Sequence, residues 1–258
     1  MFTNVKLSLK PYLFILLIFA VTLAKAQTPK RTLPSYFGFQ LRPVFPTNFI
    51  GASETTLSKS GFFTTISQRM GYSFGGTVRI GLTKLIALET GINFTERNYD
   101  LDITVPDSNV SVADEMSFIE YDVPLNGLVY IKLSEKWYMN ASLGAIVTFK
   151  PTNVGVFNSP GGFHTFTHTG LTRGKVGIDA NANVGFELRT KRKGFFYLGG
   201  SARVPFQPVF DLVADYQWQG DVVRVIEEVD GSFLSLDFKY FFPIIKNKGT
   251  QFIDGPIK

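Results

Sequence analysis

Apolar and polar side chains alternate along most of the chain between Tyr36 and Phe242. The clearest segment is 175–189, where the second face is polar or glycine and the first carries Val176, Ile178, Ala180, Ala182, Val184, Phe186 and Leu188. A period of two residues is typical of a β-strand whose two faces meet different surroundings, and a helix does not produce it.

Seven further segments alternate in the same way, at 36–45, 72–82, 85–98, 117–133, 137–149, 195–206 and 232–242. The connections between the eight segments alternate in length. Short ones lie at 83–84, 134–136 and 190–194, and long ones at 46–71, 99–116, 150–174 and 207–231. Outer-membrane barrels combine short periplasmic turns with long external loops. We therefore predict an all-β fold: an eight-stranded antiparallel transmembrane β-barrel with short periplasmic turns and four long extracellular loops.

Alternation alone does not say whether the apolar face meets lipid or a protein core, as it would in a soluble barrel. The apolar stripes carry one charge, Glu96, at an outer strand end. The polar face is rich in Gly, Ser and Asn, which are weak strand formers but leave room for larger neighbours in a narrow lumen. We therefore expect the apolar face to point outward.

The polar face then places charged side chains inside the barrel. The bases are Arg42, Arg79, Arg97, Lys132, Arg189, Arg203 and Lys239, and the acids are Glu89, Glu120, Asp122, Asp179, Glu187 and Asp237. An eight-stranded barrel is just wide enough for its own side chains to fill. Because the charges nearly balance, we expect them to pair and to plug the barrel; a selective ion path would need an unpaired row, and none is evident.

The N-terminus reads as an export signal, with Lys6 and Lys10 before an apolar run at 11–23 and then Ala24-Lys25-Ala26. The run is shorter than the roughly 20 residues of a transmembrane helix, which argues against a retained anchor. The expected organisation is a signal peptide at 1–26, a periplasmic segment at 27–34, the outer-membrane barrel at 35–242 and a periplasmic tail at 243–258.

Composition supports this organisation. The formal net charge is +5, and loss of the three lysines of the signal leaves +2, so the basic balance is no argument for a nucleic-acid partner. The chain has no cysteine, which suits bacterial export better than eukaryotic secretion. Beyond the signal no apolar run reaches 18 residues, and a membrane protein without such runs must be a barrel. The expected location is the bacterial cell outer membrane.

Candidate chemistry is sparse. His164 and His168 are the only histidines, and their four-residue spacing would suit a metal on a helix, but this stretch reads as extended or loop. No Gly-x-Ser-x-Gly motif is present. We expect no catalytic, cofactor-binding or metal-binding residues. Two other features are a basic turn at 191–193 that could meet lipid phosphates or a periplasmic partner, and an unusually apolar fourth connection that suggests a β-extension or a docking surface.

Several short motifs resemble the PorT-like outer-membrane β-barrel proteins of Bacteroidota: Gln27 after the Ala-x-Ala signal, and the stretches 36–40, 119–125 and 236–240. The resemblance covers nearly the whole mature chain. It implies the barrel fold and, because some members act in type IX protein secretion, a role in secretion; it implies no catalytic motif. The tail at 243–258 departs from barrels that end on an aromatic residue of the last strand.

These observations predict a non-enzymatic outer-membrane barrel that acts as a partner-binding component, with a link to type IX secretion. The alternatives are a lipid-modifying enzyme of the outer membrane and a narrow passive channel. The expected partners are outer-membrane lipids and secretion-system or surface proteins, with no nucleic acid, and the barrel is expected to be monomeric by itself.

Overall fold

The structure is a computed structural model that describes residues 34–48, 51–190 and 193–243. The expected signal peptide, nearly all of segment 27–34 and all but the first residue of the tail lie outside the described residues. The described elements are β1 (Tyr36–Pro46), β2 (Glu54–Lys59), β3 (Phe62–Gly81), β4 (Ile86–Val105), the 3₁₀ turn η1 (Pro106–Ser108), β5 (Val110–Lys132), β6 (Trp137–Phe149), β7 (Val154–Gly161), β8 (His164–Leu171), β9 (Val176–Arg189), β10 (Phe195–Pro205), β11 (Phe210–Trp218), β12 (Asp221–Val229) and β13 (Phe233–Phe241). Over these ranges no helix has the length and apolar character needed to cross a membrane.

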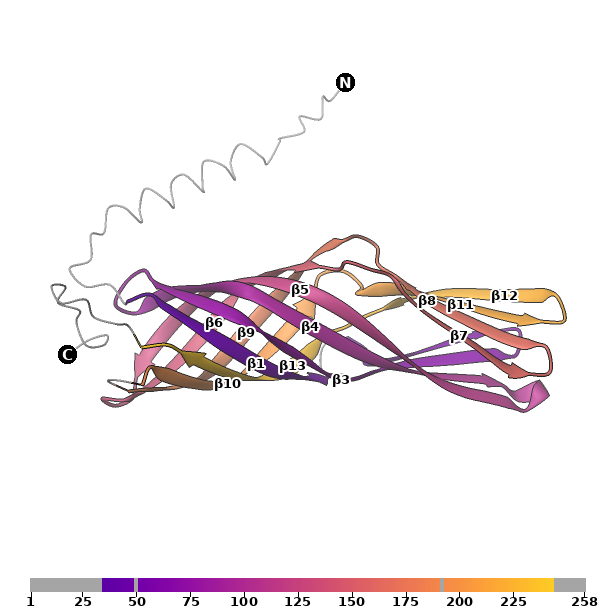
Figure 1. Ribbon diagram of the computed structural model, residues 1–258, viewed down its shortest axis with the longest axis horizontal. Coiled ribbons are helices and arrows are strands. Elements are labelled where there is room, and N and C mark those ends of the chain that lie inside the picture. Colours follow the sequence, from indigo (N-terminus) through magenta and orange to yellow (C-terminus); the bar gives the residue numbers. More distant parts are fainter. Residues whose placement is uncertain (1–33, 49–50, 191–192, 244–258) are drawn as a thin grey trace, which may run out of the picture.

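The strands form a closed ring. Their antiparallel pairings run in the order β1, β13, β10, β9, β6, β5, β4 and β3, and β3 pairs with β1 to complete the circle. Gly38, for example, is opposite Phe241 on one side and opposite Thr77 on the other. The strands of the ring match the eight segments predicted from alternation, although β3, β4 and β5 continue well beyond it (Figure 1).

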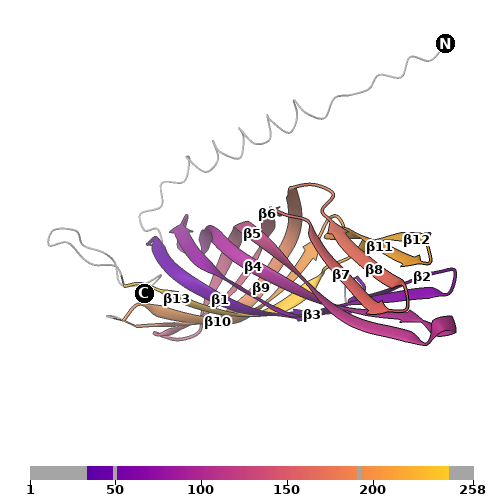
Figure 2. The ribbon, with the colours of Figure 1, turned by 45° about the vertical axis from the view of Figure 1, so that its right-hand side comes forward.

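The prediction of four long loops is wrong, because the connecting segments form strands. Among the described residues there are thirteen strands, of which eight form the ring. β12, β11, β8 and β7 form a second sheet in that order, and β2 pairs with the outer part of β3. Together with residues 62–69 of β3, 97–105 of β4 and 110–118 of β5, these strands make a body that we call the extension, on the right in Figures 1 and 2.

The extension continues the ring, but no ladder of backbone hydrogen bonds joins its two sheets among the described residues. Its sheets approach each other at two places, where β7 lies beside β5 and β12 lies beside β2. Side chains bridge both approaches: the Asn158 amide donates to Asp114 Oδ1 at 3.0 Å, and Lys59 Nζ donates to the Arg224 carbonyl at 3.1 Å. The extension is therefore two facing sheets rather than a hydrogen-bonded barrel.

The interior of the extension is an apolar core. Phe118 and Phe210 stack with ring centroids 4.2 Å apart, and Tyr99 meets Phe210 edge-on at 5.1 Å. The cluster also contains Phe62, Leu101, Ile103, Met116, Phe166, Leu212 and Tyr216, all of them buried. Burial of this much aromatic and aliphatic surface stabilises the extension as a folded body.

Polarity is inverted where the extension meets the ring. Along β5, the inward side chains change from Met116 and Phe118 to Glu120 and Asp122, all buried. On the opposite face, exposed polar Ser117 is followed after two residues by Ile119, which is 41% exposed. The extension is thus apolar inside and mainly polar outside, with separate exposed apolar side chains such as Ile226, whereas the ring is polar inside and apolar outside.

The outward apolar face that we predicted for the ring is confirmed. Ile92 and Leu143 are 67% and 71% exposed, whereas inward Arg79 is 2% exposed. The short turns at the end of the ring away from the extension are also as predicted. The backbone amides of Leu82, Leu133 and Thr190 donate to the carbonyls of Ile86, Trp137 and Gly194, respectively, each at 3.0 Å. We call this the turn end of the ring.

Candidate functional site

The interior of the ring holds two clusters of charged side chains. The first lies nearer the turn end and joins four strands. Arg79 of β3 binds Glu89 of β4 (Nη2 to Oε2, 2.6 Å) and also Glu187 of β9, which lies on the opposite side of the ring. Lys239 of β13 reaches Glu89 at 2.5 Å, and Arg189 binds Glu187 at 2.8 Å. These ion pairs tie opposite walls of the ring together.

The second cluster lies toward the extension and is centred on Arg203 of β10. Its guanidinium contacts Asp122 (Nη1 to Oδ2, 2.7 Å), Asp179 (2.5 Å) and Glu120 (3.2 Å). Glu120 also accepts from Arg97 Nε at 3.0 Å. One arginine therefore faces three carboxylates from β5 and β9, and a second arginine balances part of the remaining charge.

Uncharged polar groups occupy the space between the clusters. The Asn181 amide donates to Asn126 at 3.2 Å, and Gln40 of β1 donates to Asn93 of β4 over Gly75 of the strand between them. Asp237 has hydrogen bonds rather than an ion pair, accepting from Asn183 at 2.8 Å and from Ser235 at 2.8 Å. Because these groups hydrogen-bond mainly to one another, the network extends along the lumen.

Aromatic rings flank the charges. The Arg79 guanidinium carbon lies 4.4 Å from the Phe241 ring centroid, and that of Arg189 lies 4.3 Å from Tyr138. At the other cluster Arg97 lies 4.8 Å from the Phe233 ring. Cation–π contacts of this kind stabilise desolvated guanidinium groups.

The charged residues assigned to the lumen from sequence are largely where they were predicted. Lys132 differs, because it lies at the end of β5 and is exposed, and Arg189 is half-buried. The rest are buried: Arg42, Arg79, Arg97, Arg203, Lys239, Glu89, Glu120, Asp122, Asp179, Glu187 and Asp237. The prediction that oppositely charged side chains pair inside the ring is confirmed by the ion pairs of Arg79, Arg97, Arg203 and Lys239.

His164 and His168 lie in β8, in an extended strand rather than a helix, and both point into the extension core. His164 Nδ1 is 2.8 Å from the Tyr216 hydroxyl, and His168 Nε2 is 3.1 Å from Thr64 Oγ1. Burial lowers the pKa of His168 to about 4. In the described ranges no three His, Cys, Asp or Glu side chains are grouped to hold a metal. The two histidines therefore act as core side chains with polar partners.

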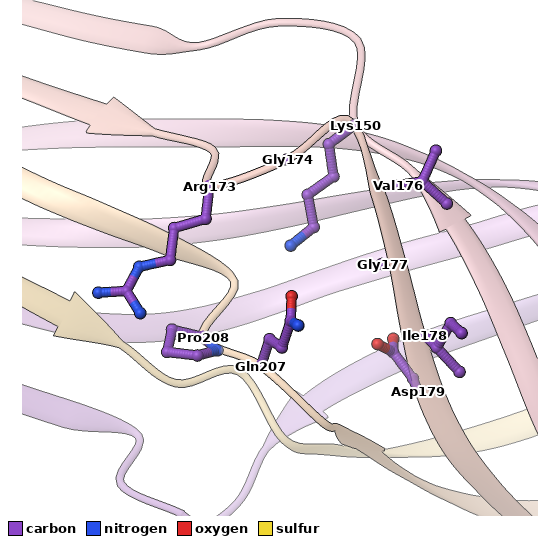
Figure 3. Close-up of a pocket in the computed structure, with 9 residues that line it drawn as sticks. All are labelled: Lys150, Arg173, Gly174, Val176, Gly177, Ile178, Asp179, Gln207 and Pro208. Carbon is purple, nitrogen blue, oxygen red and sulfur yellow. The ribbon is translucent and has the colours of Figure 1, made fainter. Parts of the chain in front are cut away.

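A small cleft marks the joint between ring and extension, and sequence reasoning did not find it (Figure 3). Lys150 Nζ donates to the Val209 carbonyl at 2.7 Å, and Arg173 Nε binds Asp211 at 2.8 Å. The cleft has a volume of about 10 Å³, space for about one water molecule. Its groups hold the joint together and leave no room for an organic ligand.

A larger hollow lies on the outer wall of the ring, and we call it the outer groove. Its volume is about 610 Å³, and its lining is almost entirely apolar. It crosses β1, β13, β10, β9 and β6, with Leu41, Trp137, Phe186, Leu198, Phe238 and Tyr240 among the lining residues. Alternation predicts that this face is apolar, but it does not predict a hollow, which depends on how neighbouring side chains pack.

Comparison with known proteins gives weak likenesses. No family model and no curated protein matches the chain. The solved structures similar to it include the outer membrane protein OprG from Pseudomonas aeruginosa, at 12% identity over 81% of this chain and 96% of that one, with a TM-score of 0.48. The β domain of the Bordetella autotransporter BrkA is 10% identical over 80% and 98% of the two chains, with a TM-score of 0.26.

Proposed function

We propose that this protein is a non-enzymatic outer-membrane β-barrel whose ring is a plugged anchor and whose extension binds a partner outside the membrane. One observation carries the proposal: the inversion of polarity along the continuous strands β3, β4 and β5. A single chain that exposes apolar side chains over one stretch and polar ones over the next is adapted to two solvents.

The apolar outer wall favours lipid as the first solvent. Contiguous exposed apolar surface is rare on soluble monomers. A closed antiparallel ring is one of the two structures that satisfy every backbone group inside a bilayer. Glu96, the one charge that the sequence predicts on the apolar stripes, lies at the edge of the apolar band. The hydroxyl of exposed Tyr72 donates a hydrogen bond to it at 2.6 Å.

The plugged interior argues against a channel. Ion pairs cross the ring between β3 and β9 and between β10 and β5, so ions could pass only if buried pairs were broken. Breaking a buried pair costs several kcal/mol because it leaves an uncompensated charge. The lumen therefore serves to hold the walls together rather than to conduct.

The far end of the extension offers a surface for a partner. Phe163 is 81% exposed and has a φ of 65°, in the left-handed region that bulky side chains rarely adopt. Trp218 lies at the neighbouring β11–β12 turn and is 41% exposed, with its ring stacked on His164. Exposed aromatic side chains on a rigid support are typical of interface centres. The family resemblance suggests secretion-system subunits as partners.

Because the chain has no cysteine, single introduced cysteines can be labelled to test its location and orientation. A single cysteine would be introduced at Gly220, at the far end of the extension, or at Glu135, at the turn end, and intact cells would be treated with a membrane-impermeant maleimide. We expect labelling at 220 and not at 135. Labelling of both in intact cells, or release of the protein by alkaline extraction of membranes, would contradict the proposal.

Partner binding is tested by crosslinking and pull-down from outer membranes of the native host. We expect a specific protein to be recovered with the wild type and lost with Phe163→Ser combined with Trp218→Ser. Phe157→Ser, at another exposed position of the extension, is the control and should retain the partner. Recovery of the protein alone would remove the binding role and leave the membrane anchor.

A further inference from the structure

We propose that the outer groove holds a phospholipid with an anionic headgroup, its acyl chain in the groove and its phosphate against the turn end. This inference rests on the proposed membrane location and adds a ligand to it. The groove is about 610 Å³ in volume, within the range of roughly 300 to 1,000 Å³ typical of small-molecule sites.

The chemistry of the groove suits a hydrocarbon chain. Phe186, Leu198 and Phe238 come from three adjacent strands, and each is 44–50% exposed. In a bilayer this surface must be covered by something apolar, and a hollow holds a chain in more contact than a flat wall does. The groove therefore distinguishes one bound lipid from the lipids that cover the rest of the ring.

The end of the groove is fixed to two turns that carry lysines. The Tyr240 hydroxyl, from the groove lining, donates to the Lys193 carbonyl at 3.0 Å. On the other side Lys136 precedes Trp137, and its carbonyl accepts from the Arg189 amide at 2.8 Å. The aromatic rings thus end next to exposed Lys136 and Lys193, as expected for a chain-to-headgroup boundary.

The charge at the turn end favours an anionic headgroup. Among the described turn residues the exposed charges are Lys84, Lys136 and Lys193 against Glu135. Basic residues near a membrane surface attract anionic lipids, by about a factor of five for each lysine. A second copy of the chain fits less well, because a two-fold contact between the same faces would bring identical lysines toward each other.

The test is native mass spectrometry of the full chain in a mild detergent, titrated with phosphatidylglycerol or with phosphatidylethanolamine of the same acyl chains. We expect one phosphatidylglycerol to bind at least tenfold more tightly than phosphatidylethanolamine. Lys136→Gln combined with Lys193→Gln should remove this preference. Lys59→Gln combined with Lys175→Gln removes two charges away from the turn end and should retain it.

A second pair of variants tests the groove itself. Leu198→Trp fills it and should reduce binding of both lipids at least tenfold. Leu125→Trp, at an outward position of β5 away from the groove that is 57% exposed, is the matched control and should have no effect. Equal affinity for the two lipids in the wild type, an unchanged preference in the lysine variant, or dimers in place of lipid adducts would each overturn the inference.

Failure of this inference can be told apart from failure of the proposed function. Membrane insertion is checked first, by alkaline extraction and by heat-dependent mobility in gels. If the protein does not insert, the proposed function fails. If it inserts and shows no lipid preference, only the lipid site is refuted.

Discussion

Replacement of Arg203 by glutamine is the sharpest test of the charged lumen. Arg203 is 2% exposed and contacts Asp122, Asp179 and Glu120 within 3.2 Å. Glutamine keeps much of the length and polarity of the side chain but removes its charge. Glu120 retains Arg97 as a partner, so the groups left uncompensated are Asp122 and Asp179.

Removal of one partner from a buried ion pair costs about 3–5 kcal/mol. We expect Arg203→Gln to lower the free energy of unfolding by this amount. The measurement is equilibrium urea unfolding of protein refolded into lipid vesicles, followed by the fluorescence of Trp137 on the ring and Trp218 on the extension. Combining Arg203→Gln with Asp122→Asn should recover part of the loss, because one of the orphaned charges is then removed.

Arg224 is the matched control. It binds Asp215 through two hydrogen bonds of 2.6 and 2.8 Å, but its side chain is 62% exposed. Exposed pairs contribute little because water and salt screen them. We therefore expect Arg224→Gln to leave stability nearly unchanged. If the two variants lose equal stability, or if Asp122→Asn worsens Arg203→Gln, the lumen network does not hold the ring as described.

Three further predictions concern the extension and the outer wall. The pKa of His168 is lowered to about 4 from 6.5, so between these values the unfolded chain binds a proton that the folded chain does not. The extension should therefore lose up to about 3 kcal/mol as pH falls from 6.5 to 4, and His168→Leu should remove that part of the dependence in pH-dependent unfolding. Phe210→Ala should cost about 3–5 kcal/mol and open the extension to trypsin while the ring stays folded, as judged by limited proteolysis; cleavage at the wild-type rate would contradict its place in the core. Leu125→Arg should reduce insertion into vesicles by about 2–4 kcal/mol, whereas Ala113→Arg, on the same face of β5 but in the extension, should insert normally; equal effects would refute the inversion of polarity.

The strands of the ring and their two faces can be predicted from the two-residue period, because a strand with one apolar and one polar face alternates in sequence. The strands of the extension alternate in the same way: Tyr99, Leu101 and Ile103 are separated by polar residues. Each predicted strand carries a single apolar face and therefore ends where the apolar face changes sides. In β3 a register shift between Arg69 and Tyr72 also changes the phase of the pattern.

The partners inside the lumen could not be predicted. Alternation shows that Arg79 and Glu187 point inward, but their pairing depends on the stagger of strands on opposite sides of the ring. A shift of two residues keeps every side chain on its face and changes every cross-ring contact. The outer groove is hidden for a related reason, because its shape depends on side chains from five strands.

Closure of the ring between its first and last strands has a consequence for biogenesis. Gly38 of β1 pairs with Phe241 of β13, so the final ladder cannot form until the chain has been delivered through β13. Contacts between residues so far apart in sequence form slowly, and until then the edges of both strands are open to mispairing. The strands of the extension lie between those of the ring in the chain, so in the proposed outer-membrane location the segments that form its apolar core must be translocated before closure completes. Assembly of this protein should therefore depend strongly on chaperones that hold the chain extended and on machinery that shields the two open edges.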